Sequence, residues 1–178
     1  MALPVEGTPV PVSRWYRHAP RGRDPLLPTR PPPDNRWQRG AVIGALYLAS
    51  DQETVWAEWY RLLAEAGIPP NHALPRALWA WEVDPEPGVA DLRTKARLDQ
   101  VGLGMPRPGR DTWAPCQEVG ETLWREGWRG LMAPSAARPT RGVVLVLFRP
   151  DDAVPGARPI PPPSLVTEPP VPPRGMAT

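Results

Sequence analysis

Two glutamates, Glu53 and Glu58, stand five positions apart in the stretch YLASDQETVWAEWYRLL at residues 47–63. The second half of this stretch predicts a helix, because its apolar residues recur at helical spacing and form one stripe. The stripe consists of Val55, Trp59, Leu62, Leu63 and Ala66. At about 100° per residue, Glu53 faces away from the stripe, whereas Glu58 lies at its margin. A carboxylate at the margin can face a cleft and take part in its chemistry, or it can be a half-exposed charge paired with Arg61.

A local structural role accounts for Glu53. Ser50 and Glu53 have the S-x-x-E spacing of a capping box, in which each side chain accepts a hydrogen bond from a free backbone N–H at the helix start. Gly67 then ends the helix, with prolines two residues further on. Glu58 has no such local explanation and remains a candidate for chemistry.

Four further residues have side chains suited to a binding or catalytic site. Arg17 and Arg36 carry planar guanidinium groups that bind phosphate or carboxylate oxygens in pairs, and Tyr47 and Ser135 carry hydroxyls. Each also has an ordinary interpretation: an edge-strand arginine stacked on tryptophan, a loop anchor, a core tyrosine and a turn serine. Taken one at a time, none of them specifies a function.

Several common kinds of site are excluded by the motifs. The sequence has neither G-x-x-x-x-G-K-[ST] nor a G-x-G-x-x-G that opens a helix, which argues against both phosphate-binding loops. His18 and His72 are isolated and Cys116 is the single cysteine, so no metal site, histidine triad or disulfide framework is predicted. The arginines among residues 1–40 can bind anions, but they are too sparse and too mixed with proline for a nucleic-acid groove.

Two features of the sequence predict where in the cell the protein is found: its N-terminal segment and the length of its apolar stretches. The N-terminal sequence MALPVEGTPVPVSR lacks the charged start and the apolar run of a signal peptide. No apolar stretch reaches the ~18 residues that span a membrane. We therefore expect a cytoplasmic protein with no membrane partner and no direct nucleic-acid partner.

Proline makes up 29 of the 178 residues and is concentrated towards the two ends. Because proline lacks the N–H that a helix or ladder needs, residues 151–178 are predicted to be a disordered or polyproline-like tail, and residues 1–11 a disordered N-terminus. The working domain is then expected over residues 12–150. Within it, the proline-rich stretch 20–35 is predicted to be a long loop, of the kind that is usually functional or mobile.

The other segments mix strands and helices without strict alternation, which favours an α+β fold over a doubly wound sheet. Predicted strands lie within residues 13–19, 41–50, 76–83, 130–136 and 142–150. Besides the helix after residue 50, predicted helices lie within residues 91–103 and 114–127.

In this order, the motifs resemble those of the RES domain family, which is named for an arginine, a glutamate and a serine. The matching pieces are YR at 16–17, RWQRG at 36–40, YLASDQETVWAE at 47–58, DL at 91–92, GLMAPSA at 130–136 and VVLVLF at 143–148. The Tyr–x10–Glu piece, with an alanine before the glutamate, is the most specific. The chain departs from the family where Gln38 replaces a frequent asparagine, and where Asp34 and Asn35 replace glycines.

The resemblance implies a fold similar to that of ADP-ribosylating toxins, with a mixed β core, flanking helices and a cleft for NAD. It implies a toxin of a bacterial toxin–antitoxin pair that cleaves the nicotinamide–ribose bond of NAD, with inorganic phosphate or water as the attacking group and no metal. The implied partner is an antitoxin that carries a DNA-binding helix-turn-helix domain and plugs the cleft.

Carried over position by position, the family's residues fall on Arg17, Arg36, Tyr47, Glu58 and Ser135. The resemblance implies that both arginines bind the pyrophosphate of NAD, and that Glu58 stabilises the positive charge that develops on the ribose. Tyr47 would stack on this ribose or hydrogen-bond to it, and Ser135 would donate to a phosphate oxygen. Of the five, Glu58, Arg36 and Tyr47 are the expected catalytic residues, and all but Glu58 are expected to bind NAD.

Two other functions stay open. The same fold can transfer ADP-ribose to a cellular protein, because the residues that bind NAD do not specify the acceptor. A RES module without activity would only bind its partner.

Overall fold

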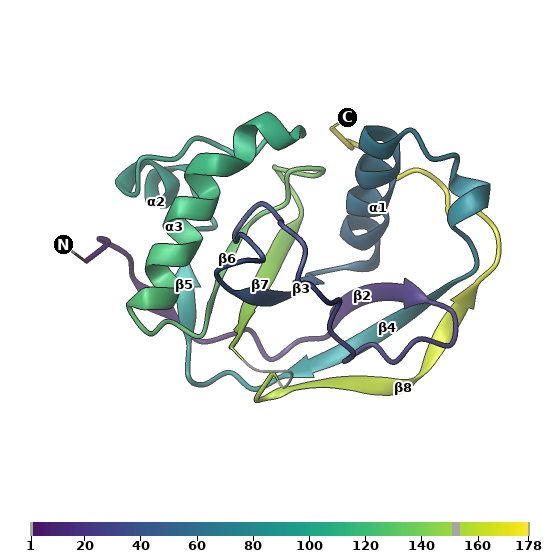
Figure 1. The fold of residues 1–178 in the computed structure, drawn as a ribbon, viewed down its shortest axis with the longest axis horizontal. Coiled ribbons are helices and arrows are strands. Elements are labelled where there is room, and N and C mark those ends of the chain that lie inside the picture. Colours follow the sequence, from purple (N-terminus) through teal and green to yellow (C-terminus); the bar gives the residue numbers. More distant parts are fainter. Residues whose placement is uncertain (1, 151–153, 178) are drawn as a thin grey trace.

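The computed structural model describes residues 2–150 and 154–177. Over these residues, eight strands form one mixed sheet in the order β1-β5-β6-β7-β3-β2-β4-β8, in which only the β5–β6 pair is parallel, and helices flank this sheet (Figure 1). The strands are β1 (Gly7–Thr8), β2 (Trp15–Pro20), β3 (Gly44–Ala49), β4 (Arg76–Val83), β5 (Val89–Asp91), β6 (Gly130–Pro134), β7 (Val143–Arg149) and β8 (Ala157–Val166). The α-helices are α1 (Gln52–Ala66), α2 (Lys95–Gln100) and α3 (Trp113–Arg125), with short 3₁₀ turns at Pro70–Ala73 and Arg110–Thr112. The predicted α+β class is confirmed.

The sheet is nearly divided between β2 and β3. These two strands share a single register pair, Tyr16 with Ala49, whereas β2 forms six pairs with β4 and β3 forms six with β7. The strands β2, β4 and β8 therefore diverge from the other five and cross beneath them (Figure 1). The division matters because it leaves backbone groups and side chains of β2 and β3 facing a space between the two halves.

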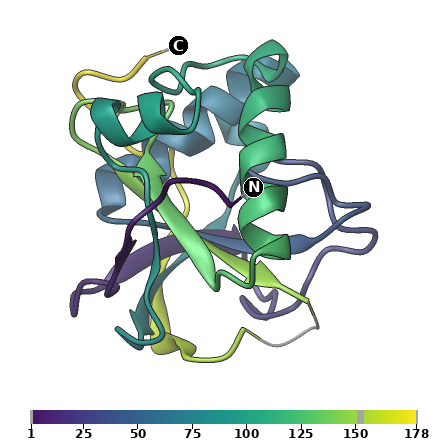
Figure 2. The same ribbon diagram turned by 90° about the vertical axis from the view of Figure 1, so that its left-hand side faces the viewer.

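Alternation along the strands gives the sheet two apolar faces. On β7, Val144 and Val146 pack on one face with side chains of α3, and Leu145 and Leu147 lie on the other. Strands β2 and β4 cover this second face. A second hydrophobic core therefore lies between the two halves of the sheet, which we call half-sheets: β2, β4 and β8 on one side, and the other five strands on the other. The helix α1 covers the outer side of β2 and β4 through Trp56 and other apolar residues. Helices α3 and α1 stand at opposite ends of the sheet (Figure 1), and Figure 2 shows α3 nearer the viewer with α1 behind it.

The start of α1 differs from the predicted capping box. The cap is Asp51, whose carboxylate accepts from the Thr54 backbone N–H at 2.8 Å. Ser50 is not available, because its Oγ accepts from the backbone N–H of Val143 on β7 at 3.1 Å. Glu53 does not reach back to the helix start either, and instead pairs with Arg138 at 2.6 Å. The Ser50–Glu53 box was therefore the wrong pair, although the helix begins where it was expected.

The predicted apolar stripe is right in its centre and wrong at its end. Val55, Trp59 and Leu63 are buried, but Leu62 is 44% exposed and Ala66 is exposed as well. Leu62 lies on the same side as Glu58, one turn on, and lines the cavity described below. The margin of the stripe thus faces an open space, as its position beside Glu58 suggested.

The prediction of a disordered tail over residues 151–178 is wrong for most of the segment. Residues 157–166 form β8, which pairs with β4 from Val83↔Ala157 to Arg76↔Val166. A proline-rich strand is tolerated here because β8 is an edge strand, whose residues need donors on one side only. The three prolines 161–163 stand where the register shifts, between the pairs Ala80↔Ile160 and Leu78↔Ser164. Residues 151–153 lie outside the described part of the chain.

The rest of the described tail and the described N-terminal residues also contact the domain. The hydroxyl of Tyr60 on α1 donates to the Pro170 carbonyl, and the Ala177 N–H donates to the Ala137 carbonyl at 2.8 Å. At the other end, β1 pairs with β5 and Val10 is 1% exposed. The domain is therefore wider than the predicted 12–150, and the prediction of a disordered N-terminus over 1–11 is wrong for the described residues.

We predict that removing the cap weakens the fold more than removing Glu53. The Asp51→Ala substitution should lower the free energy of unfolding by about 1 kcal/mol, the usual cost of a lost cap. Glu53→Gln should cost about 0.5 kcal/mol or less, since the Glu53 carboxylate is exposed and Arg138 keeps Asp51 as a partner. Urea unfolding of both variants checks the order, and an equal or larger loss for Glu53→Gln contradicts the assignment of the cap.

A second prediction concerns the tail. A chain ending at residue 168 keeps β8 and should unfold cooperatively near the temperature of the full chain. A chain ending at residue 155 leaves β4 as a bare edge and should lose a few kcal/mol, at roughly 1 kcal/mol for each ladder hydrogen bond. Thermal unfolding followed by circular dichroism compares the two, and equal stabilities would show that β8 contributes nothing.

Candidate functional site

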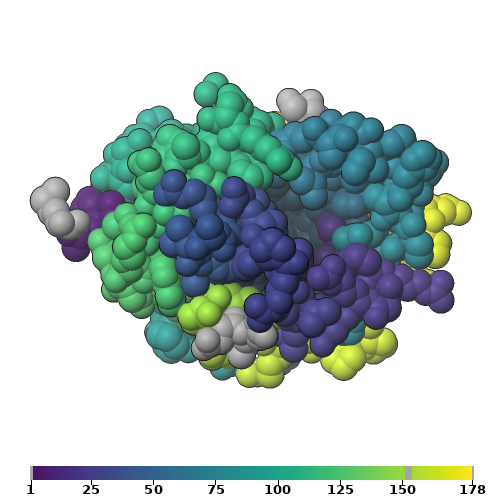
Figure 3. All heavy atoms as spheres, viewed as in Figure 1, coloured from purple at the N-terminus to yellow at the C-terminus, as the bar shows by residue number. Residues whose placement is uncertain are grey.

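A cavity of about 1120 Å³ opens where β2 and β3 part. Its walls come from these two strands, from α1 and from the loop between β2 and β3, and Figure 3 shows the surface hollowed between the loop residues and α1. The volume is slightly above the usual range of about 300–1,000 Å³ for small-molecule sites. The long loop expected at residues 20–35 is therefore a wall of this cavity.

Glu58 lines the cavity from α1 and is held in place by its neighbours. The Ser135 hydroxyl donates to its Oε1 at 2.6 Å, and Arg61 Nε donates to its Oε2 at 3.0 Å. The backbone N–H of Ala137 approaches Oε1 at 3.4 Å. The structure thus brings together the predicted glutamate and serine, which are 77 residues apart in the sequence. The Glu58–Arg61 pair is also present, so Glu58 both faces the cavity and is paired with Arg61, and its part in chemistry stays a prediction.

Ser135 lies behind Glu58 and does not line the cavity. It is fully buried directly after β6, where its Oγ accepts from the backbone N–H groups of Ala137 and Arg138 at 3.2 and 3.1 Å. These bonds shape the turn after β6 and aim the hydroxyl proton at Glu58. The expected contact of Ser135 with a phosphate stays a prediction, whereas its contact with the carboxylate is direct.

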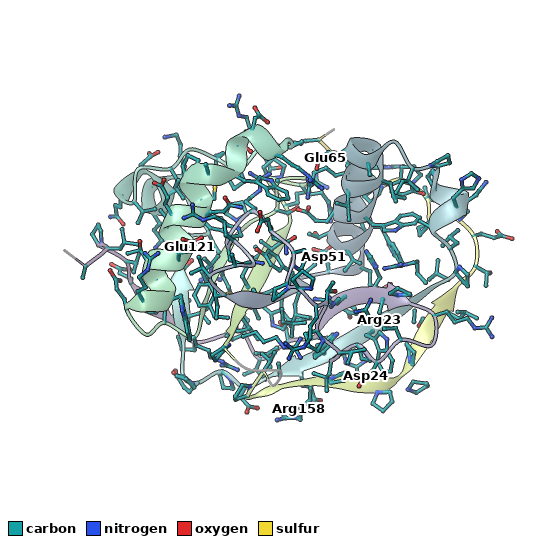
Figure 4. The ribbon with its side chains drawn as sticks, in the orientation of Figure 1. Arg23, Asp24, Asp51, Glu65, Glu121 and Arg158 are labelled. Atoms are coloured by element: carbon teal, nitrogen blue, oxygen red, sulfur yellow. The ribbon has the colours of Figure 1, made fainter. Side chains whose placement is uncertain are left out.

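Arg61 belongs to the site, although the sequence alone indicates it only as a partner that would make Glu58 ordinary. It lies between two glutamates of α1, and its Nη1 donates to Glu65 at 2.5 Å. Burial lowers its pKa, but the two carboxylates outweigh burial, so the pKa is raised. Glu65 in turn accepts from the Gly109 N–H at 3.1 Å, which ties this end of α1 to the segment before α3 (Figure 4). Arg61 thus stays charged beside Glu58.

Tyr47 holds the cavity wall together. Its hydroxyl donates to Gln38 Oε1 at 2.5 Å and accepts from the Trp37 N–H at 3.1 Å. Burial raises the pKa of this tyrosine, which therefore stays protonated. Gln38 also donates to the Pro33 carbonyl at 3.2 Å, so the residue that departs from the family pattern fixes the end of the proline-rich loop. Both hydroxyl positions of Tyr47 are occupied by protein groups.

Arg36 lines the cavity, but its guanidinium is already engaged. Nη1 donates to Thr112 Oγ1 at 2.8 Å and Nη2 donates to the Arg107 carbonyl at 2.6 Å. Burial lowers its pKa, while the nearby Cys116 and Glu58 act in the opposite direction. Arg36 thus anchors the segment before α3 to the cavity wall. Its predicted role as a phosphate clamp stays a prediction, and it would require these bonds to be shared.

Arg17 lies in a different electrostatic environment. Its Nη1 spans the gap between the half-sheets to the Tyr47 carbonyl, at 3.5 Å. Burial, and then the positive charges of Arg149, Arg23 and Arg76, lower the pKa of Arg17 to about 10. The two predicted arginines therefore do not form one clamp: Arg36 is near Glu58, and Arg17 is grouped with other arginines.

His18 also lines the cavity, although the sequence indicates only an isolated histidine. Its ring stacks on Trp56 with centroids 5.6 Å apart, and its Nδ1 lies 2.7 Å from Arg76 Nη2. Burial, then Arg76 and Arg17, lowers the pKa of His18 to about 3, so the imidazole is neutral at pH 7. The signal was present in SRWYRHA, where alternation puts Tyr16 and His18 on one strand face, but the partners of that face lie far away in sequence.

Metal sites and membrane spans are two further features that the described residues could contain. No group of three or more histidine, cysteine, aspartate or glutamate side chains is placed to hold a metal ion. No described helix combines the length and apolar character that crossing a membrane requires.

The fold and the cavity define an α+β protein with a ligand-sized cleft between two half-sheets. The sequence pattern of the RES domain matches residues 10–168, and the chain belongs to the RES domain family. Among solved structures, it is similar to a chain in the crystal structure of the M. tuberculosis MbcT–MbcA toxin–antitoxin complex. The TM-score is 0.71 and the identity 25%, over 86% of this chain and 87% of that one. No curated protein matches the sequence.

The contact between Ser135 and Glu58 gives a prediction that needs no assay of function. In a double-mutant cycle of Ser135→Ala and Glu58→Gln, urea unfolding should give a coupling of about 1 kcal/mol, below the usual value for a bond to a charged group because Glu58 is partly exposed. Ser135→Ala alone should cost about 1–3 kcal/mol, because it leaves two buried N–H groups without an acceptor. A coupling near zero would mean that the hydroxyl does not hold the carboxylate.

Proposed function

We propose that the protein cleaves the nicotinamide–ribose bond of NAD, with Glu58 at the reacting ribose. The observation that carries the proposal is the position of Glu58: its carboxylate faces a ligand-sized cavity and is fixed from behind by Ser135. A glutamate that served only as a surface charge would not require a buried hydroxyl bonded to one of its carboxylate oxygens. Membership of the RES domain family supports the same assignment.

The role of Glu58 follows from how positive charge moves during the reaction. The nicotinamide ring carries this charge before the bond breaks, and the ribose carries it afterwards. When the bond between ribose C1′ and the nicotinamide nitrogen breaks, the electron pair leaves with the nitrogen, and nicotinamide becomes neutral. The ribose is left as an oxocarbenium ion, whose positive charge a carboxylate stabilises. Glu58 can hold a ribose hydroxyl and this charge together. A phosphate oxygen or a water then bonds to C1′, and an attacking water loses a proton.

The other predicted residues take supporting roles in this proposal. Ser135 and Arg61 keep the Glu58 carboxylate in one orientation, so that no reorientation is needed when the charge develops. Tyr47 and Arg36 fix the wall beside the ribose, through the 33–38 segment and the segment before α3. In this proposal Arg17, which reaches the Tyr47 carbonyl across the gap between the half-sheets, contacts the phosphates of NAD.

We further propose that the protein is the toxin of a toxin–antitoxin pair. The similar solved structure is that of a toxin–antitoxin complex, and the similarity extends over most of both chains. The partner expected from the family resemblance is an antitoxin with a helix-turn-helix domain. An antitoxin segment that entered the cavity would block NAD, so adding the partner should abolish cleavage.

The proposal predicts NAD cleavage by the purified protein without its antitoxin. NAD is incubated with the protein, with and without inorganic phosphate, and the products are separated by chromatography. Nicotinamide release that requires phosphate indicates phosphorolysis, and release without phosphate indicates hydrolysis. Label that moves from NAD to a protein would indicate ADP-ribosyl transfer instead. Intact NAD with folded protein under every condition would contradict the proposal and favour a module that only binds its partner.

Two glutamates of one helix provide the matched test of the mechanism. Glu58→Gln should lower the rate of nicotinamide release by about 10²–10³-fold, the usual loss when a group that stabilises transition-state charge is removed. Glu53→Gln removes an exposed carboxylate five residues away and should leave the rate within about twofold. Circular dichroism confirms that both variants fold. Equal rates for the two variants would remove Glu58 from the reaction.

A further inference from the structure

An arginine outside the cavity is buried in the turn between β6 and β7. Arg138 is 5% exposed and does not line the cavity. Its Nη1 donates to Asp51 Oδ1 at 2.8 Å and to Thr54 Oγ1 at 3.1 Å, and its Nη2 donates to Glu53 Oε2 at 2.6 Å. These partners all belong to the start of α1, where Asp51 lies (Figure 4). A buried ion pair often contributes no more to stability than apolar side chains of the same size, and its best supported use is to fix one geometry.

The β6–β7 turn contacts α1 at two points that are one helical turn apart. Arg138 binds the helix at Thr54, and the Ser135 hydroxyl donates to Glu58 at 2.6 Å. Because Thr54 and Glu58 are four residues apart, their side chains lie on the same side of α1. Within the turn the two contacts are linked, since the Arg138 backbone N–H donates to Ser135 Oγ at 3.1 Å. The turn is therefore fixed along the helix as well as against it.

The other end of the turn closes on the same residue of α1. The Gly142 N–H donates to the Arg138 carbonyl at 2.8 Å. A Cβ at position 142 would lie 2.6 Å from Thr54 Oγ1 and 2.8 Å from Thr54 Cγ2, closer than side-chain atoms approach one another. A glycine is needed here because the backbone of the turn packs directly on Thr54. The turn therefore has little room to shift on the helix while Arg138 keeps its contacts.

We propose that Arg138 is a positioning residue, which holds the β6–β7 turn on α1 and thereby keeps the Ser135 hydroxyl on Glu58. Arg138 does not face the cavity, so it acts on the site only through Ser135. A carboxylate that is held in one orientation needs no reorganisation when positive charge develops beside it. The inference rests on the proposed function and deepens it, because it names the contact that keeps Glu58 ready to act.

Kinetics of NAD cleavage distinguish positioning from a general structural role. Arg138→Met keeps the apolar stem, and it buries no unpaired carboxylate because Asp51 and Glu53 are partly exposed. It should lower kcat by about tenfold or more through misplacement of Glu58, with KM within about twofold because the cavity lining is unchanged. In a Ser135→Ala protein the same substitution should cause no further loss. Equal losses with and without the Ser135 hydroxyl would overturn the inference.

Two more variants serve as controls for folding. Arg138→Lys keeps a positive charge and one bond to the start of α1, and it should recover part of the lost kcat. Arg93→Met removes another arginine that pairs with a carboxylate, Asp91 at 2.6 Å, but Arg93 does not line the cavity. It should leave kcat within about twofold. A loss in Arg93→Met as large as that in Arg138→Met would mean that general destabilisation causes both, and would overturn the inference.

A second measurement requires no turnover and separates this inference from the proposed function. The coupling between Ser135→Ala and Glu58→Gln in urea unfolding should fall by at least about half when the cycle is repeated in an Arg138→Met or Arg138→Lys protein. In an Arg93→Met protein it should keep its value. A coupling that the Arg138 substitutions leave unchanged overturns the inference, whether or not NAD is cleaved. If the unsubstituted protein leaves NAD intact and the coupling still falls, the proposed function fails, whereas the positioning of Glu58 by Arg138 is supported.

Discussion

The site depends on the parting of β2 from β3. A sheet with a complete β2–β3 ladder would use the backbone groups of both strands and close the space between the half-sheets. Here one register pair, Tyr16 with Ala49, joins the halves, and beyond it Arg17 reaches across to the Tyr47 carbonyl. A side chain thus satisfies an acceptor that a ladder would otherwise have used. The cavity exists because this side-chain contact replaces the ladder hydrogen bonds between β2 and β3.

Around this opening, the structure separates two kinds of environment. Glu58 is fixed by a buried hydroxyl and a neighbouring arginine, and it supplies negative charge where a ribose cation would develop. Arg17, in contrast, is buried among the positive charges of other arginines, and both burial and these charges lower its pKa. A dinucleotide with a cationic ring at one end and a pyrophosphate in its middle carries the complementary pattern. The proposal that NAD is the ligand rests on this match of charge as well as on Glu58.

Much of the architecture could be predicted from local patterns. The helix α1 and the strands β2, β3, β4, β6 and β7 follow from periodicity, and the margin position of Glu58 follows from helical geometry. The capping residue could not be predicted, because Ser50 and Asp51 both suit a cap. Only the position of β7 shows that the Ser50 hydroxyl is used by Val143. The strand β8 was missed because proline content argues against strands in general, whereas an edge position tolerates it.

The candidate site could be predicted only in part, because it too depends on contacts between segments that are distant in the sequence. Glu58 and Ser135 belong to separate segments, and their contact depends on how α1 packs beside the end of β6, which no local pattern encodes. The family resemblance supplied that pairing in advance. It did not supply His18 and Arg76, whose contact requires the β2–β4 register that puts Pro20 opposite Arg76. Nor did it reveal that Arg36 and Arg17 have different surroundings.

The most direct test of the account is a crystal structure of the Glu58→Gln protein with NAD, since this variant should bind the dinucleotide without cleaving it. The account predicts the nicotinamide ribose beside residue 58 and a phosphate group within hydrogen-bond distance of Arg17. NAD bound outside the cavity, or with its phosphates beside residue 58 and its nicotinamide among the arginines, would contradict it.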